Sequence, residues 1–208
     1  MKNLETEFKW NAQTPRAFMR MLGAVKQLAY AEEISAPTAL HITDTYLDQP
    51  DGTFEKEQLA FRVRHCEKTW EATFKTRTQL VNGKAVRREE TQKLPGVKNI
   101  QQALEKLAAQ KIWKNLPVRG LRPLFTICNK RLVRVITRTH FRAELAFDTC
   151  TIYAGNKHVK FKEIELELKQ GRADNFDKFA QQLTVQSGLA RAEKSKVKTA
   201  VSLLKGEL

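Results

Sequence analysis

Polar and apolar residues alternate along many short segments of this chain, starting near the N-terminus. In residues 3–10 (NLETEFKW), charged residues occupy every second position: Glu5, Glu7 and Lys9. Thr6, Phe8 and Trp10 fill the positions between them. Because side chains two residues apart share a face of a β-strand, the segment predicts a strand with one charged and one mostly apolar face. Taken alone, such a strand would ordinarily turn its charged face to water.

The same alternation predicts further strands along the rest of the chain. They are expected at residues 39–48, 58–64, 70–75, 86–92, 124–136, 141–148 and 159–169. Turn signals separate several of them, including Gln49-Pro-Asp-Gly52 and Asn82-Gly83. With the first segment, about eight strands are therefore expected.

Three segments have helical spacing instead, at residues 14–23, 98–112 and 174–183, and a short helical tail follows near the C-terminus. The first begins with Thr14-Pro15, a cap followed by a first-turn proline, and Gly23 is expected to end it. Each helix has one apolar face. Because no internal repeat or long linker interrupts the chain, residues 1–208 are expected to form one domain.

Charges on the predicted strands are segregated by sign. Glu163, Glu165 and Glu167 alternate on the last strand, whereas Arg62 and Arg64 alternate on a central one. Neighbouring carboxylates repel one another unless cations are present, and clusters of carboxylate oxygens suit Mg²⁺ or Mn²⁺. Arginine forks suit phosphate oxygens. The charged faces are therefore expected to line a wet, ligand-filled tunnel, while the helices cover the outward apolar faces.

Composition narrows the classes of partner. The chain has 37 Lys and Arg against 23 Asp and Glu, a formal net charge of +14, so its partners are expected to be anions. Zinc-finger spacing, aromatic-rich RNA-binding strands and a purely basic tail are all missing, which argues against nucleic acid. The chain has no apolar run near the roughly 20 residues of a membrane span and no signal-peptide pattern, which predicts a cytoplasmic protein. The cysteines and histidines form no metal or nucleophile pattern.

In order and spacing, these motifs resemble the CYTH superfamily, also called triphosphate tunnel metalloenzymes. Glu5-x-Glu7-x-Lys9 resembles its N-terminal ExExK motif, and residues 59–64 (LAFRVR) resemble its LRxR strand. Further resemblances are carried by Tyr46-Leu-Asp48, Thr73-Phe-Lys75, Glu144-Leu-Ala-Phe-Asp148 and the stretch from Glu163 to Gly171. The resemblance covers nearly the whole chain. It implies an α+β fold in which an eight-stranded antiparallel closed β-barrel, or tunnel, has a charged interior and helices on its outer faces.

The resemblance also implies roles for individual residues. One or two Mg²⁺ or Mn²⁺ ions would be held by Glu5, Glu7, Asp148, Glu163, Glu165 and Glu167. Catalysis would involve Glu5, Glu7, Lys9, Arg62, Arg64, Lys75 and Arg131. The triphosphate would contact Lys9, Arg62, Arg64, Lys75, Arg87, Arg131 and Lys196. Two alternatives stay open: Arg88 with Glu90 could face inward instead of the preferred Arg87 with Glu89, and Lys196 could be a solvated tail residue.

Residues 123–131 and 163–171 are most similar to the bacterial inorganic triphosphatase branch. The hypothesis is therefore metal-dependent hydrolysis of inorganic tripolyphosphate, a small-molecule substrate, to pyrophosphate and phosphate. The same tunnel could instead cyclise ATP, hydrolyse thiamine triphosphate, process RNA ends, or bind polyphosphate or nucleotide without turnover. Asn129 stands where cyclases commonly have lysine, and Trp10, Trp70 and Trp113 are predicted away from the tunnel, which argues against cyclase and thiamine activities. A homodimer is common among similar proteins.

Overall fold

The computed structural model describes residues 3–29, 33–81, 84–109, 120–192 and 194–207. Within these ranges the strands are β1 (Asn3–Asn11), β2 (Thr38–Asp48), β3 (Ala60–Cys66), β4 (Thr69–Lys75), β5 (Gln79–Val81), β6 (Lys84–Lys93), β7 (Arg122–Arg138), β8 (Phe141–Ala154) and β9 (Lys157–Gly171). The helices are α1 (Pro15–Leu28), α2 (Thr53–Lys56), α3 (Ile100–Ala109), α4 (Ala173–Ser187) and α5 (Lys196–Lys205).

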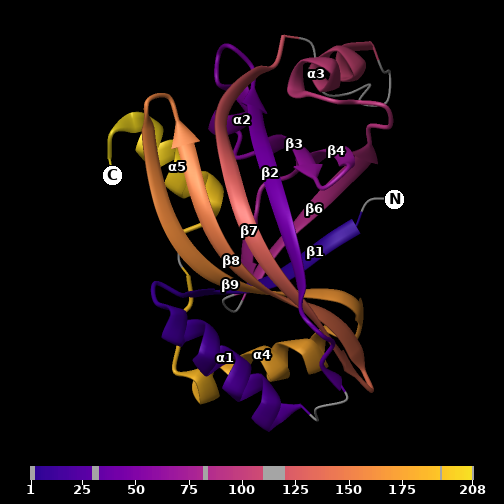
Figure 1. The fold of residues 1–208 in the computed structure, drawn as a ribbon, viewed down its shortest axis with the longest axis vertical. Coiled ribbons are helices and arrows are strands. Elements are labelled where there is room, and N and C mark those ends of the chain that lie inside the picture. Colours follow the sequence, from indigo (N-terminus) through magenta and orange to yellow (C-terminus); the bar gives the residue numbers. More distant parts are fainter. Residues whose placement is uncertain (1–2, 30–32, 82–83, 110–119, 193, 208) are drawn as a thin grey trace.

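Eight of these strands close into an antiparallel barrel (Figure 1), which confirms the expected fold. Their order is β1-β9-β8-β7-β2-β3-β4-β6, and β6 pairs back with β1. The short β5 adds a hairpin partner to β6. The N-terminal strand joins the two ends of the sheet, because Glu5 lies opposite Arg87 on one side and Lys9 lies opposite Glu165 on the other. The acidic first and last strands therefore lie side by side, and β6 with Arg87 lies on the other side of the first strand.

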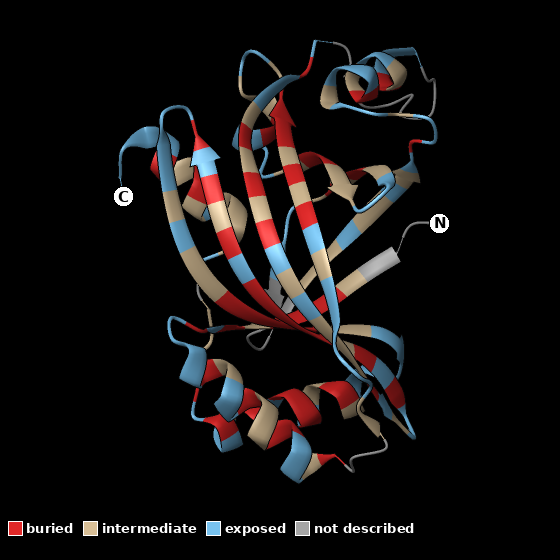
Figure 2. Ribbon diagram, in the orientation of Figure 1, coloured by how far each residue is buried: buried red, intermediate tan, exposed pale blue. Residues whose placement is uncertain are grey.

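Helices α1 and α4 cover one outer part of the barrel (Figure 1). The alternate residues Phe8 and Trp10 of β1 point outward into this cluster, as do Ile164 and Leu166 of β9. Trp10 is fully buried, and its indole Nε1 donates to Thr184 Oγ1 at 3.0 Å. Figure 2 marks buried residues along both helices and along the strands next to them. The outward apolar faces are thus covered by helices, as predicted.

A second apolar cluster lies outside β3 and β4. Phe61 and Val63 of β3 and Ala72 of β4 pack there with Ala103 and Leu107 of α3. The short α2 contributes its buried aromatic residue to the same cluster. The prediction that helices cover both outer regions of the sheet is therefore confirmed.

The helix boundaries differ from the expected ones. Gly23 does not end α1, which continues to Leu28, because the apolar face extends through the buried Ala24 and Val25. The helix expected at 98–112 appears as α3 over Ile100–Ala109. Its expected last residues, Trp113 and the Asn82-Gly83 turn lie outside the described residues.

Helix α5 packs on the inward-facing side of the barrel. The sequence analysis predicted only a short helical tail here and did not predict this packing. Ala200 and Leu203 of α5 belong to one apolar cluster with the inward-facing Tyr46, Ile127 and Ile152. The lumen therefore has an apolar part, filled against α5, and a charged part, in which the predicted site residues lie. In the part of the chain that is described, no helix has both the length and the apolarity needed to cross a lipid bilayer.

Candidate active site

The charged part of the lumen contains a cavity of about 260 Å³. Side chains from almost every barrel strand line it, together with the start of α5. The predicted site residues on its wall are Glu5, Glu7, Lys9, Arg62, Arg64, Lys75, Arg87, Arg131, Glu165, Glu167 and Lys196. Asp148 and Glu163 lie behind this wall and contact Lys196. The structure therefore brings the sequence-predicted residues of all three sets to one place.

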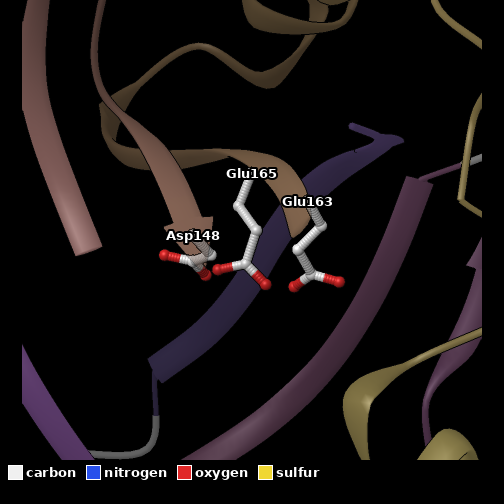
Figure 3. A group of neighbouring side chains, drawn as sticks. All are labelled: Asp148, Glu163 and Glu165. Atoms are coloured by element: carbon white, nitrogen blue, oxygen red, sulfur yellow. The ribbon is translucent and has the colours of Figure 1, made fainter. Parts of the chain in front are cut away.

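Three carboxylates form a compact group on β8 and β9 (Figure 3). Asp148 and Glu163 are cross-strand partners, and Glu165 is two residues further along β9 on the same face. One oxygen from each lies within 4.8 Å of the others. All three residues are buried, with exposed fractions of 0%, 3% and 7% for Asp148, Glu163 and Glu165. Three buried acids this close repel one another unless cations neutralise their charge or one of them takes up a proton.

Three basic side chains supply that charge. Lys196 Nζ lies 2.8 Å from Asp148 Oδ2 and 2.9 Å from Glu165 Oε1, and it also contacts Glu163. Lys9 Nζ donates to Glu165 Oε1 at 2.7 Å. Arg131 donates twice to Asp148, from Nε at 2.7 Å and from Nη2 at 2.6 Å, and it contacts Glu165 as well.

The two glutamates of this group differ in acidity. Burial raises the pKa of Glu163 to about 7, although Lys196 and Lys9 oppose the rise. Burial acts in the same direction on Glu165, but Lys196, Lys9 and Arg131 together hold the pKa of Glu165 well below its usual value. Burial likewise opposes the charge of Lys196, yet the surrounding carboxylates keep its pKa well above the ordinary range. Glu165 is thus the firmly ionised centre of the group.

A second charged group lies where β1, β4 and β6 meet. Arg87 Nε donates to Glu5 Oε2 at 2.5 Å and to Glu89 Oε1 at 3.2 Å. Lys75 Nζ lies 3.8 Å from Glu5 Oε2 and also contacts Glu89. Of the two registers considered for β6, the structure has Arg87 and Glu89 facing the cavity. Burial, with repulsion from Arg62 and Arg87, lowers the pKa of Lys75 to about 8.

Asp44 is a site residue that the sequence analysis missed. It is 5% exposed on β2, directly opposite Arg64 of β3. Its carboxylate accepts two hydrogen bonds from Arg64, at 2.7 and 2.8 Å, and one from Arg62 Nη1 at 3.3 Å. Burial would raise the pKa of Asp44, but the two guanidinium groups hold it well below its usual value. Its position two residues before Tyr46, on the same strand face, was the available signal.

Asp48 lies outside the cavity, unlike Asp44 on the same strand. The tyrosine-aspartate motif contains it, yet its carboxylate accepts hydrogen bonds from the backbone N–H groups of Phe54 at 2.8 Å and Glu55 at 3.0 Å. Asp48 therefore holds the start of α2 and does not line the cavity. Asn129, noted for its departure from the cyclase pattern, does line it.

The chemistry of the donor set fits a hard divalent cation. Asp148, Glu163 and Glu165 offer only carboxylate oxygens, the ligands that Mg²⁺ and Mn²⁺ prefer. The other predicted ligands lie at the wall near this group: Glu7 is 3.3 Å from Lys9, and Glu167 pairs with Lys169 at 3.0 Å. In the same cavity, Arg62, Arg64 and Arg87 offer donors suited to phosphate oxygens. The cavity can thus hold cations and a phosphate anion side by side.

Comparisons with known proteins identify a family and relatives. Residues 3–201 match the CYTH domain. An inorganic triphosphatase of Haemophilus influenzae is 28% identical over 159 residues, which cover 76% of this chain. The aligned region is 45% of that relative, so the chain spans less than half of its length.

Solved structures share the fold. A candidate adenylyl cyclase from Hippeastrum, reported to have a dominant triphosphatase activity, superposes with a TM-score of 0.62 at 15% identity and 95% coverage of both chains. A Pyrococcus horikoshii protein superposes with a TM-score of 0.63 at 16% identity, covering 96% of this chain and 99% of the other.

Proposed function

This chain belongs to the CYTH domain family, and we propose that it is a metal-dependent enzyme that hydrolyses inorganic tripolyphosphate to pyrophosphate and phosphate. One observation carries the proposal: buried carboxylates suited to a divalent cation share a single cavity with guanidinium and ammonium groups suited to phosphate. The names of the Haemophilus and Hippeastrum proteins, both of which refer to triphosphatase activity, support it.

The basic residues are proposed to position the substrate. Arg62, Arg64 and Arg87, with Lys75, form one basic side of the cavity, and Arg131 with Lys9 and Lys196 lies beside the carboxylates. Phosphoryl transfer depends mainly on aligning the reacting groups and neutralising the charge of the phosphates. In the proposed reaction, a water oxygen bonds to a terminal phosphorus and the bond from this phosphorus to the bridging oxygen breaks. Pyrophosphate leaves with the electron pair of that bond, and the proton lost by the water passes to solvent. Glu5 and Glu7 complete the proposed catalytic set.

Asp148, Glu163 and Glu165 are proposed to hold Mg²⁺ or Mn²⁺, with Glu5, Glu7 and Glu167 as further ligands. When bound, such an ion would neutralise phosphate charge and polarise the phosphorus–oxygen bonds. Arg131 and Lys9 would keep these carboxylates oriented toward the cavity, because each donates a hydrogen bond to the group. Titration of the protein with Mg²⁺ and with Mn²⁺ would give the number of ions bound and the preferred metal.

Two features favour an inorganic substrate over a nucleotide. The cavity volume of about 260 Å³ is below the roughly 300–1,000 Å³ of pockets that hold drug-sized organic ligands. Among the described residues that line it, Tyr46 is the one aromatic residue, and its ring is buried against Phe125 at a centroid distance of 4.8 Å. No aromatic surface on this wall is therefore free to stack on a base or on thiamine.

The direct test is phosphate release from tripolyphosphate, ATP and thiamine triphosphate, each with Mg²⁺, Mn²⁺ or EDTA. We expect rapid release from tripolyphosphate only with a divalent metal, and its loss in Glu7→Gln at unchanged far-UV circular dichroism. Release from none of the three would reject the enzyme and favour a phosphate-binding module. Formation of cyclic AMP from ATP would favour a cyclase.

A further inference from the structure

Lys196 occupies the centre of the carboxylate group. Its Nζ lies 2.8 Å from Asp148 Oδ2 and 2.9 Å from Glu165 Oε1, and it also contacts Glu163 Oε1. Of the basic residues that the structure describes, Lys196 is the one with an ion pair to all three acids; Lys9 pairs with one of them and Arg131 with two. A single ammonium therefore stands where the three carboxylate oxygens converge.

Helix α5 fixes this position. Lys196 is the first residue of α5, whose start is capped by Ser195 Oγ accepting from Lys198 N at 3.2 Å. The apolar side of α5, including Ala200 and Leu203, packs in the apolar part of the lumen. Because the helix is anchored there, the side chain at its first position is directed to the carboxylates.

The ammonium of Lys196 stands where a metal bound by these oxygens would stand. The three ligand atoms lie within 4.8 Å of one another. Adjacent oxygens around Mg²⁺, with bonds near 2.0–2.1 Å in octahedral geometry, lie about 2.9 Å apart. A metal at this point would draw the carboxylates together and would repel the positive charge of Lys196.

We propose that Lys196 is an internal cation that competes with the divalent metal for Asp148, Glu163 and Glu165, and that it thereby sets the metal affinity of the site. This inference rests on the metal site of the proposed function. Metal binding displaces the ammonium from the three carboxylates, and the released ammonium then lies beside the cavity in which the triphosphate binds. In the metal-free protein, the same ammonium keeps three buried acids compatible with folding.

The test is the affinity of Mn²⁺ alone, measured by calorimetry on the full chain without substrate. Lys196→Met keeps the length and apolar stem of the side chain and removes its charge. We expect Mn²⁺ to bind about 10- to 100-fold more tightly to this variant than to the wild type. A general electrostatic effect of losing one positive charge is controlled by Lys198→Met, because Lys198 is an exposed lysine on the same helix, two residues after Lys196.

A second measurement uses the wild-type protein, in case Lys196→Met does not fold. Hydrogen exchange of the backbone amides in the first turn of α5 is followed with and without Mn²⁺. Displacement of Lys196 predicts faster exchange at residues 196–199 on metal binding, with little change in α4. Unchanged or slower exchange there would overturn the proposal.

The outcomes separate this inference from the function on which it rests. Equal or weaker Mn²⁺ binding by Lys196→Met, or an equal gain in Lys198→Met, overturns the competition by Lys196 even if tripolyphosphate is hydrolysed. Absence of Mn²⁺ binding in every variant overturns both the competition and the metal part of the proposed function. Tighter binding confined to Lys196→Met supports the competition whatever the substrate proves to be.

Discussion

The two parts of the barrel lumen are built from the same strands but have opposite chemistry. On β8 the inward-facing residues run from Asp148 to Cys150 and Ile152, and on β9 they run from Glu165 and Glu163 to Phe161. The period-two alternation continues across the change. What changes is the neighbour: α5 packs over the apolar positions, and the charged positions face the cavity.

The difference shows what each part contributes. Apolar side chains gain stability from burial alone, whereas buried charges require partners of opposite sign. The apolar part holds α5 in place and so positions Lys196. In the charged part, acidic and basic side chains form ion pairs with one another, such as Arg131 with Asp148 and Lys9 with Glu165. The same side chains are the groups available to bind a ligand. Substitutions in the apolar part should therefore lower mainly stability, and substitutions in the charged part should lower mainly activity.

The largest expected effect is in the charged part. Glu165→Gln removes the carboxylate that contacts Lys9, Arg131 and Lys196, and we expect turnover of tripolyphosphate to fall about 100-fold or more. Initial rates of phosphate release with Mg²⁺ or Mn²⁺ measure this. The control is Glu144→Gln, since the Glu144 side chain is 34% exposed and 3.6 Å from Lys169. Near-wild-type turnover in Glu165→Gln would show that this carboxylate is not part of the active site.

In the apolar part, the expected effect is on stability. Ile152 is fully buried beneath α5, so Ile152→Ala should lower the free energy of unfolding by about 2–5 kcal/mol. Urea denaturation measures this loss. Turnover per folded molecule at 25 °C should stay within about twofold of the wild type. The milder Ile152→Val should lose about 0.5–1.5 kcal/mol, and a loss of turnover without a loss of stability would contradict the division between the two parts.

Asp44 tests how the charged part is organised. Its carboxylate holds both Arg64 and Arg62, so Asp44→Asn should leave the two guanidinium groups less well oriented. We expect KM for tripolyphosphate to rise about tenfold with a smaller change in kcat. Steady-state kinetics separate the two constants, and exposed Asp174→Asn is the matched control. An unchanged KM would show that the arginines need no such support.

The smallest expected effect is a pH dependence from Lys75. Its pKa, lowered by burial and by Arg62 and Arg87 to about 8, means that the ammonium is present below pH 8 and is lost above it. Binding of phosphate needs the charged form, so kcat/KM should fall about threefold between pH 7.5 and 8.5. Lys75→Arg, which stays charged, should flatten this limb. The same slope in both proteins would assign the titration to another group.

Alternation along the strands predicted much of this fold and of the candidate site. Because each strand has two faces, the spacing of Glu5 and Glu7, or of Arg62 and Arg64, already indicated which side chains lie together. Closure of the barrel then needed only the pairing of the first strand with β6 and β9. The apolar faces of the predicted helices indicated in the same way what covers the outside.

The remainder depends on contacts that local sequence does not record. Asp44 is a single acid among threonines and becomes significant only because β2 pairs with β3. In the sequence alone, Lys196 cannot be distinguished from a solvated tail residue. Packing of α5 against the inward-facing side of β8 and β9 brings it to Asp148, which is 48 residues away in the chain. The continuation of α1 past Gly23 likewise follows from packing against α4 and the sheet.

The most direct test is a crystal structure of the wild-type protein with tripolyphosphate and Mn²⁺, with anomalous diffraction recorded to locate the metal. We expect manganese density against Asp148, Glu163 and Glu165, and the triphosphate between that density and the guanidinium groups of Arg62, Arg64 and Arg87. Metal and anion bound on the outer surface of the barrel, with the charged cavity still closed by its own ion pairs, would contradict the assignment of this cavity as the active site.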